Sequence, residues 1–123
     1  MLYTASFYDP EHWQGRRYRV SRAHPRGRPV DWDTAPSLYP PRELLQAYRS
    51  GQLNFAALST EYLKELDADY QQNAQFQEWV DGLPTVADLT LLCFERGDTP
   101  CHRRVAAQWL LDKAPGLVRG ELR

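Results

Sequence analysis

The sequence predicts an α/β fold in which a small, mostly parallel sheet is flanked by helices in a Rossmann-like three-layer arrangement. Two observations indicate this fold. β-prone runs alternate with segments that place apolar residues at helical spacing. The longest apolar run, Val86 to Phe94, has the pattern of a strand covered on both faces, as in the middle of a parallel sheet. The chain has the length of one ordinary domain, so we expect a single domain over residues 1–123.

The first third of the chain is expected to contribute two strands. Leu2 to Phe7 is a β-prone run that ends at the turn-like pair Asp9-Pro10. Tyr18 to Ser21 alternates apolar and polar residues and leads into an exposed, basic loop at His24 to Gly27. The proline-rich stretch from Asp33 to Pro41 predicts a connecting loop.

Three helices are expected to follow, each with apolar residues at helical spacing: Pro41 to Gly51, Asn54 or Ser59 to Leu66, and Asn73 to Val80. The run from Val86 to Phe94 should then be the central strand. After it, Thr99 can cap a helix whose first turn holds Pro100. A last short strand is predicted at Leu117 to Leu122.

The composition excludes several classes of protein. Hydrophobic residues make up 42% and charged residues 25%, near the globular average. No apolar stretch approaches the ~18 residues that a membrane span requires, so we expect no membrane partner. The start, Met1 to Pro10, lacks the pattern of a signal peptide, and two cysteines are too few for a secreted disulfide framework. These features predict a cytoplasmic protein.

Polar residues gather where the predicted strands end. Ligands of an open parallel sheet bind beyond the carboxyl ends of its strands. The residues at those ends are Thr4 and Ser6, Ser21 and Arg22, and Cys93 and Glu95. The helix that starts near Cys101, His102 and Arg103 follows the last of them, and a helix N-terminus favours an anion.

We assign candidate roles to these residues by their chemistry. Thr4, Ser6, Ser21, Arg22 and Arg103 are candidates for binding an anionic ligand. The candidate catalytic residues are the two thiols, a carboxylate and an imidazole: Cys93, Glu95, Cys101 and His102. The sequence identifies no cofactor.

Two other kinds of site are open. The thiols with Glu95 and His102 offer four potential metal ligands within ten residues, but the spacing matches no paired zinc motif, and on a helix Cys101 and His102 would diverge, so no metal is assigned. The basic segment Arg16 to Arg28 lies near Trp13 and Trp32, a pattern compatible with nucleic acid. The net charge of −1 argues against a wholly basic surface.

A resemblance to a known family supports the same residues. Leu2 to Ser6, Val20 to Arg22, and above all the pattern C-x-E-x(5)-C-H-R formed by Cys93, Glu95 and Cys101 to Arg103 resemble the short, single-domain form of the domain-of-unknown-function 488 family. The resemblance implies an α/β fold and a polar cleft at the matching positions, and it implies no established reaction. Members often carry a Gly-His pair after the first strand; this chain has Ala5-Ser6 there.

The sequence therefore leaves three functions open. The first is binding of a phosphate- or nucleotide-like anion at the strand-to-helix turn, with the residues of a nucleotide- or nucleic-acid-processing enzyme around it. The second is a non-catalytic module that binds nucleic acid or a protein through Arg16 to Arg28. The third is a metal-binding or thiol-sensing protein centred on Cys93 and Cys101. The oligomeric state is not indicated.

Overall fold

The computed structural model describes residues 1–123 and contains one five-stranded sheet in which every pair of neighbouring strands is parallel. The strands, in the spatial order β3-β2-β4-β1-β5, are β3 (Asp33–Thr34), β2 (Arg16–Arg19), β4 (Leu89–Cys93), β1 (Leu2–Ser6) and β5 (Arg119–Leu122). The α-helices are α1 (Arg42–Arg49), α2 (Phe55–Gln72), α3 (Ala74–Gly82) and α4 (His102–Lys113). The predicted α/β fold with a parallel sheet is confirmed.

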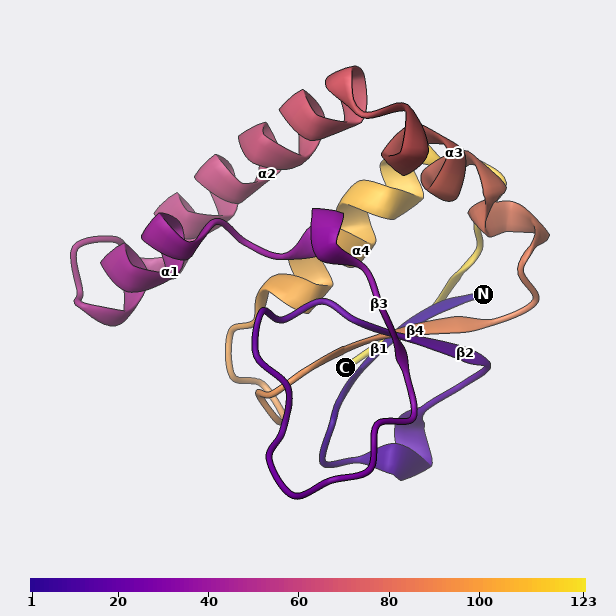
Figure 1. Ribbon diagram of the computed structural model, residues 1–123, viewed down its shortest axis with the longest axis horizontal. Helices are drawn as coiled ribbons and strands as arrows, with labels where there is room; N and C mark the ends of the chain where they lie inside the picture. Colours follow the sequence, from indigo (N-terminus) through magenta and orange to yellow (C-terminus); the bar gives the residue numbers. More distant parts are fainter.

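The elements form three layers (Figure 1). The four α-helices lie on one side of the sheet, with α4 closest to the strands and α1 and α2 farther out. The one-turn helix η1 (Pro10–His12) and the loop between β2 and β3 lie on the other side. No helix of the structure combines the length and the apolar character needed to cross a membrane.

The strand β4 is central because it is the most completely apolar. All five of its residues are buried, and it pairs with β1 on one side and β2 on the other. The registers Ser6 opposite Cys93 and Arg19 opposite Leu92 bring the carboxyl ends of the three strands to one edge. Main-chain hydrogen bonds continue past these ends, from Phe7 N to Cys93 O (2.9 Å) and from Val20 N to Leu92 O (3.1 Å).

The two faces of the sheet carry separate apolar clusters, as the alternation of side chains along a strand requires. Leu89, Leu91 and Cys93 belong to the large cluster under the helices. Ala5, Phe7 and Leu92 point to the opposite face, where aromatic side chains of the loops cover them: Trp13, Trp32 and Phe94. The Phe7 ring lies 4.8 Å from that of Trp32 and 5.2 Å from that of Phe94, measured between ring centroids.

Two strand predictions are corrected by the structure. The second strand is Arg16–Arg19 and not Tyr18 to Ser21, so it starts two residues earlier, in a stretch whose arginines hid the pattern. Partly exposed arginine stems can occupy such strand positions while their charged ends reach solvent. The loop predicted from Asp33 onwards begins with the two-residue edge strand β3, which is too short to show a periodicity.

Helix boundaries also differ from the prediction. The helix α2 is capped by the side chain of Asn54, which accepts a hydrogen bond from Ala57 N (2.8 Å), and it continues to Gln72 rather than Leu66. The predicted cap at Thr99 and first turn at Pro100 are wrong. Cys101 is the N-cap of α4, with an extended backbone (φ −147°, ψ 139°), and the first helical residue is His102.

Gly15, just before β2, is required by both its backbone and its neighbour. Its φ is +63°, and a Cβ there would lie 2.2 Å from the carbonyl oxygen of Asp88. We expect Gly27→Ala (φ +72°, open space) to lower the free energy of unfolding by only the about 1–2 kcal/mol of a left-handed backbone. Gly15→Ala should cost about 1–3 kcal/mol more, because the new methyl group clashes with the chain. Urea unfolding of both variants checks this; equal losses would contradict it.

Asp67 joins α2 to α4 and should make stability depend on pH. Its carboxylate accepts a hydrogen bond from Trp109 Nε1 (2.9 Å) and pairs with Lys113 Nζ (3.1 Å), contacts that lower the pKa of Asp67. A lowered pKa stabilises the folded state above the unfolded pKa of about 3.9, and the gain is lost as pH falls through the folded-state pKa.

We therefore expect wild type to exceed Asp67→Asn in stability by up to about 1 kcal/mol at pH 7, because the pair is half-exposed. The difference should vanish in acid. Thermal unfolding between pH 7 and pH 3 measures it, with Asp112→Asn, an exposed aspartate without an ion-pair partner, as the control. A difference that persists at pH 3 would exclude the carboxylate as its source.

Candidate thiol-histidine site

The segment between β4 and α4 brings the predicted catalytic residues together. Cys93 is the last residue of β4, Cys101 is the extended residue before α4, and His102 is the first residue of α4. All three side chains are buried, and one ligand atom from each lies within 4.8 Å of the others. The expectation that Cys101 and His102 diverge is wrong, because Cys101 precedes the helix and its extended backbone turns its side chain back.

The imidazole of His102 is held in one orientation. Its Nε2 lies 2.7 Å from the carbonyl oxygen of Val20, so Nε2 carries the proton and donates it there. Its Nδ1 then has a free lone pair, and Nδ1 faces Cys93 Sγ at 3.9 Å. The ring of Tyr62 packs edge-on against the imidazole, with 5.7 Å between centroids. A thiol, a base and an acceptor that orients the base are the parts of an activated nucleophile.

Glu95 is the carboxylate of this site. Its Oε2 accepts a hydrogen bond from Cys93 Sγ at 3.2 Å. Burial raises the pKa of Glu95 above its ordinary value, and the neighbouring Cys101 thiol raises it further. Glu95 makes no ion pair with an arginine, although the sequence offered several.

The two thiols shift each other's pKa. The pKa of Cys101 is lowered, first by the neighbouring Cys93 thiol and then by His102. The pKa of Cys93 is raised by the same Cys101 partner and by burial. The thiolate form is therefore favoured at Cys101 and disfavoured at Cys93. Both cysteines are free.

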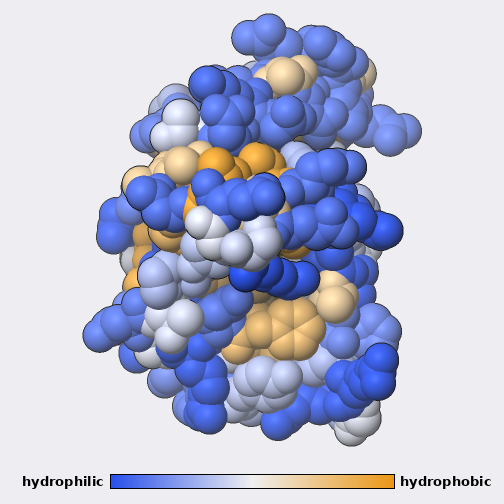
Figure 2. All heavy atoms as spheres, turned by 90° about the vertical axis from the view of Figure 1, so that its left-hand side faces the viewer, coloured by the Kyte–Doolittle hydropathy of each residue, from blue (hydrophilic) through white to orange (hydrophobic).

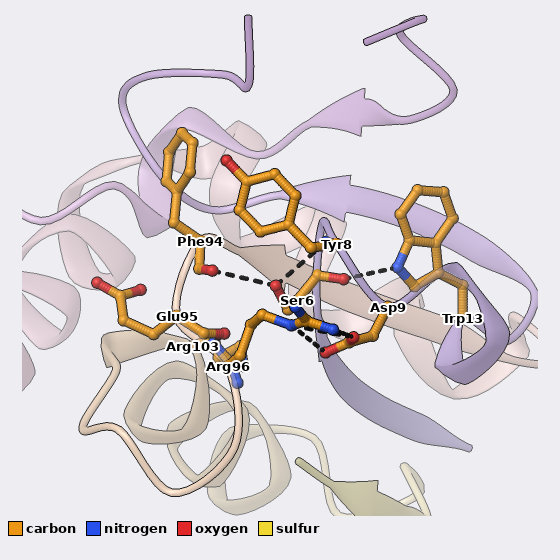
Figure 3. Close-up of polar contacts among 8 residues, drawn as sticks. All are labelled: Ser6, Tyr8, Asp9, Trp13, Phe94, Glu95, Arg96 and Arg103. Atoms are coloured by element: carbon orange, nitrogen blue, oxygen red, sulfur yellow. Dashed lines mark hydrogen bonds and ion pairs between the residues drawn. The ribbon is translucent and has the colours of Figure 1, made fainter.

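The side chain of Arg103 is directed into the fold, toward the main chain of Glu95 (Figure 3). Its side chain is 1% exposed; Nε donates to the carbonyl oxygen of Arg123 (2.8 Å) and a terminal nitrogen donates to that of Glu95 (2.8 Å). The carboxylate of Glu95 points away from Arg103. The predicted anion-binding arginine is thus engaged by two main-chain carbonyl groups.

Thr4 and Ser6, the predicted ligand-binding residues of β1, also bond to the main chain. Thr4 Oγ1 donates to the carbonyl oxygen of Arg123 (3.2 Å) and Ser6 Oγ to that of Phe94 (3.0 Å). Ser6 Oγ accepts in turn from Tyr8 N (3.1 Å), and Figure 3 shows it between the two segments. Both hydroxyl groups tie β1 to its neighbours.

A pocket of about 410 Å³ opens over the thiols at the carboxyl ends of β2 and β4. We call it the arginine pocket; its lining is Ser21, Arg22, Ala23, Arg42, Leu45, Gln46, Arg49, Cys93, Phe94, Glu95 and His102. Figure 2 shows this side of the molecule, where hydrophilic side chains surround a band of hydrophobic atoms. Of the sequence-predicted residues, the pocket unites Ser21, Arg22, Cys93, Glu95 and His102; Thr4, Ser6, Cys101 and Arg103 do not line it.

The helix α1 adds residues that sequence analysis missed. Arg42, Leu45, Gln46 and Arg49 follow one another at spacings of three, one and three residues, which places them on one face of the helix. The seven-residue interval between the two arginines already indicates that they share one face of the helix. It could not be assigned to the site, because nothing in the sequence indicates that α1 lies over the end of β4.

The basic segment Arg16 to Arg28 is largely engaged within the molecule. Arg16 pairs with Asp33 and Arg17 with Asp31, and their guanidinium groups stack on Tyr18 and Trp13. Arg19 donates to the hydroxyl group of Tyr39 (2.8 Å). Most of the charges and aromatic rings of this segment are thus paired with each other within the molecule.

An open parallel sheet with thiol, imidazole and carboxylate groups at its carboxyl edge defines the protein as an α/β protein with a cysteine-centred polar site. The chain belongs to the domain-of-unknown-function 488 family, because the family model described as the active DUF488-N3 subclade matches residues 2–114. Comparison with curated proteins and with solved structures gives no match.

Replacing Arg103 tests whether it serves the fold. Arg103→Gln should lower the free energy of unfolding by at least about 2 kcal/mol, because it removes two charge-assisted hydrogen bonds made by a side chain that is 1% exposed. The control is Arg26→Gln, at an exposed arginine, which should change stability by less than about 0.5 kcal/mol. Urea unfolding compares them. Wild-type stability in Arg103→Gln would show that the two bonds do not support the fold.

Proposed function

We propose that the protein binds a small phosphate-bearing molecule, such as a nucleotide, in the arginine pocket and acts on it with Cys93, Glu95 and His102. The observation that carries this proposal is the meeting, in one hollow, of three arginines with a thiol, a carboxylate and an imidazole. Guanidinium groups bind phosphate oxygens bidentately, and the other three groups are those of acid-base and nucleophilic catalysis.

The charge on the pocket is available to a ligand. Arg22, Arg42 and Arg49 are exposed and none makes an ion pair, whereas Arg16, Arg17, Arg96 and Arg123 are paired with carboxylates. Arg22 is oriented by one hydrogen bond from Nε to the carbonyl oxygen of Pro40 (2.8 Å), which leaves its terminal nitrogens free. Arg42 begins α1, where the positive end of the helix dipole also favours an anion.

The neighbouring surface has room for the rest of the ligand. A second hollow of about 660 Å³ lies between α1, α2 and the segment before α1, and it shares Arg22 and Arg42 with the arginine pocket. A phosphate bound at these two arginines leaves an organic group on one side and the reactive residues on the other. Pockets of these volumes suit small molecules. The family model's description as an active subclade agrees with an enzyme.

Phosphate binding should depend on the arginines of α1. In chelator-treated protein at constant ionic strength, we expect a nucleoside monophosphate at tenfold its Kd to stabilise wild type by about 1.4 kcal/mol, a rise in Tm of about 5 °C. The variant with both Arg42→Gln and Arg49→Gln should lose this rise. It should still fold, because both arginines are exposed and make no ion pair, and because the loss of positive charge is favourable at the N-terminus of α1 (Arg42) and unfavourable by a similar small amount at its C-terminus (Arg49).

Inorganic phosphate serves as a second probe and Arg26→Gln as the matched arginine control, since Arg26 is exposed and lies outside both hollows. A Tm rise in Arg26→Gln equal to that of wild type supports the site. Equal rises in wild type and in the double variant would mean that the ligand binds elsewhere, and the proposal would fail.

A further inference from the structure

Three buried side chains, two at the floor of the arginine pocket and one behind it, form a set of metal-ligand atoms that the proposed phosphate site does not explain. Cys93, Cys101 and His102 place two sulfur atoms and one ring nitrogen within 4.8 Å of one another. Cys101 does not line the pocket, so its position behind Cys93 has no role in holding a phosphate.

The chemistry of these atoms is specific. Two thiolates and one imidazole, with the fourth position left open, are a ligand set that zinc takes in catalytic sites. The second contact of His102 also fits this use. Its Nε2 donates to the carbonyl oxygen of Val20 at 2.7 Å, which fixes the ring and leaves Nδ1 free; histidines that bind metals are held by such a bond on their other nitrogen.

The separations are close to those of a tetrahedral site. With zinc–sulfur distances of about 2.3 Å and zinc–nitrogen distances of about 2.0–2.1 Å, tetrahedral ligands are about 3.8 Å apart for two sulfur atoms and about 3.5–3.6 Å apart for a sulfur and a nitrogen. Cys93 Sγ and His102 Nδ1 are 3.9 Å apart, and no two of the three ligand atoms are more than 4.8 Å apart. Small rotations of these three side chains would bring the ligand atoms to the separations of a tetrahedral site. No cation competes for the position, because Arg103 points away toward main-chain carbonyl groups.

We propose that Cys93 Sγ, Cys101 Sγ and His102 Nδ1 bind one Zn²⁺ whose fourth position opens into the arginine pocket. Cys93 and His102 line that pocket and Cys101 closes the site behind them. Glu95 lies beside it, with Oε2 3.2 Å from Cys93 Sγ, where it can hydrogen-bond a water molecule on the metal. The inference deepens the proposed function, because Cys93 and His102 belong to both and serve as metal ligands when Zn²⁺ is bound. It does not require the phosphate site, because the three ligands are distinct from the three arginines.

Cobalt titration of the reduced, metal-free full chain tests the site. Co²⁺ should bind one ion per chain, with the strong visible bands of tetrahedral coordination and the near-ultraviolet charge-transfer absorption of thiolate ligands, and Zn²⁺ should displace it. Cys101→Ser should lose part of the charge-transfer absorption, and His102→Ala should weaken binding at least about 100-fold. His24→Ala, the matched control at an exposed histidine, and Glu95→Gln should keep the spectrum.

Three results would overturn the metal site: no tetrahedral spectrum in wild type, an unchanged spectrum in Cys101→Ser, or a Cys93–Cys101 disulfide that forms in place of metal binding. Circular dichroism of each variant shows whether it is folded, and Zn²⁺-dependent rises in Tm of wild type and His24→Ala provide a second measurement. The two proposals fail separately. The double variant Arg42→Gln, Arg49→Gln should bind Co²⁺ normally, and phosphate binding is measured without metal.

Discussion

The buried guanidinium group of Arg103 is the interaction on which the geometry of the site depends. A full charge in the interior is tolerated only where hydrogen bonds replace water, and Arg103 has these from the carbonyl groups of Glu95 and Arg123. These two contacts join the first turn of α4 to the loop after β4 and to the end of β5. They therefore hold Cys101 and His102, the residues just before Arg103, against the end of the central strand.

The chemistry of the protein lies where three segments meet around this anchor. The ends of β2 and β4 supply the floor of the pocket because parallel strands finish at the same edge, and α1 supplies charges from above. The floor is buried and its groups are coupled, so protons and metal ions compete for the same sulfur and nitrogen atoms. The rim is exposed and basic. A buried floor of thiol and imidazole groups below an exposed basic rim supports the proposal that the protein binds a phosphorylated molecule.

Most of the elements and the position of the site can be predicted from the amino-acid sequence alone. The apolar run around β4 has the pattern of a covered strand, and β4 lies at the centre of the sheet; Pro41 directly precedes α1, and Gly51 lies just past its end. The pattern C-x-E-x(5)-C-H-R put its polar residues at one strand-to-helix turn. Local periodicity is enough for this, because it reflects which face of an element is buried. Periodicity did not predict β2 and β3 correctly, because β2 is rich in arginine and β3 has only two residues, so neither shows an alternation of apolar and polar residues.

Which polar side chains face the pocket depends on contacts between segments that are distant in the sequence. Arg103 turned inward because a carbonyl group at the far end of the chain, that of Arg123, accepts its hydrogen bond, and no local pattern records such a partner. Thr4 bonds the same carbonyl. Arg42 and Arg49 entered the site because the packing of α1 over the sheet brought them there. The direction of a side chain depends on partners that are distant in the sequence, whereas the secondary structure of a segment depends mainly on neighbouring residues.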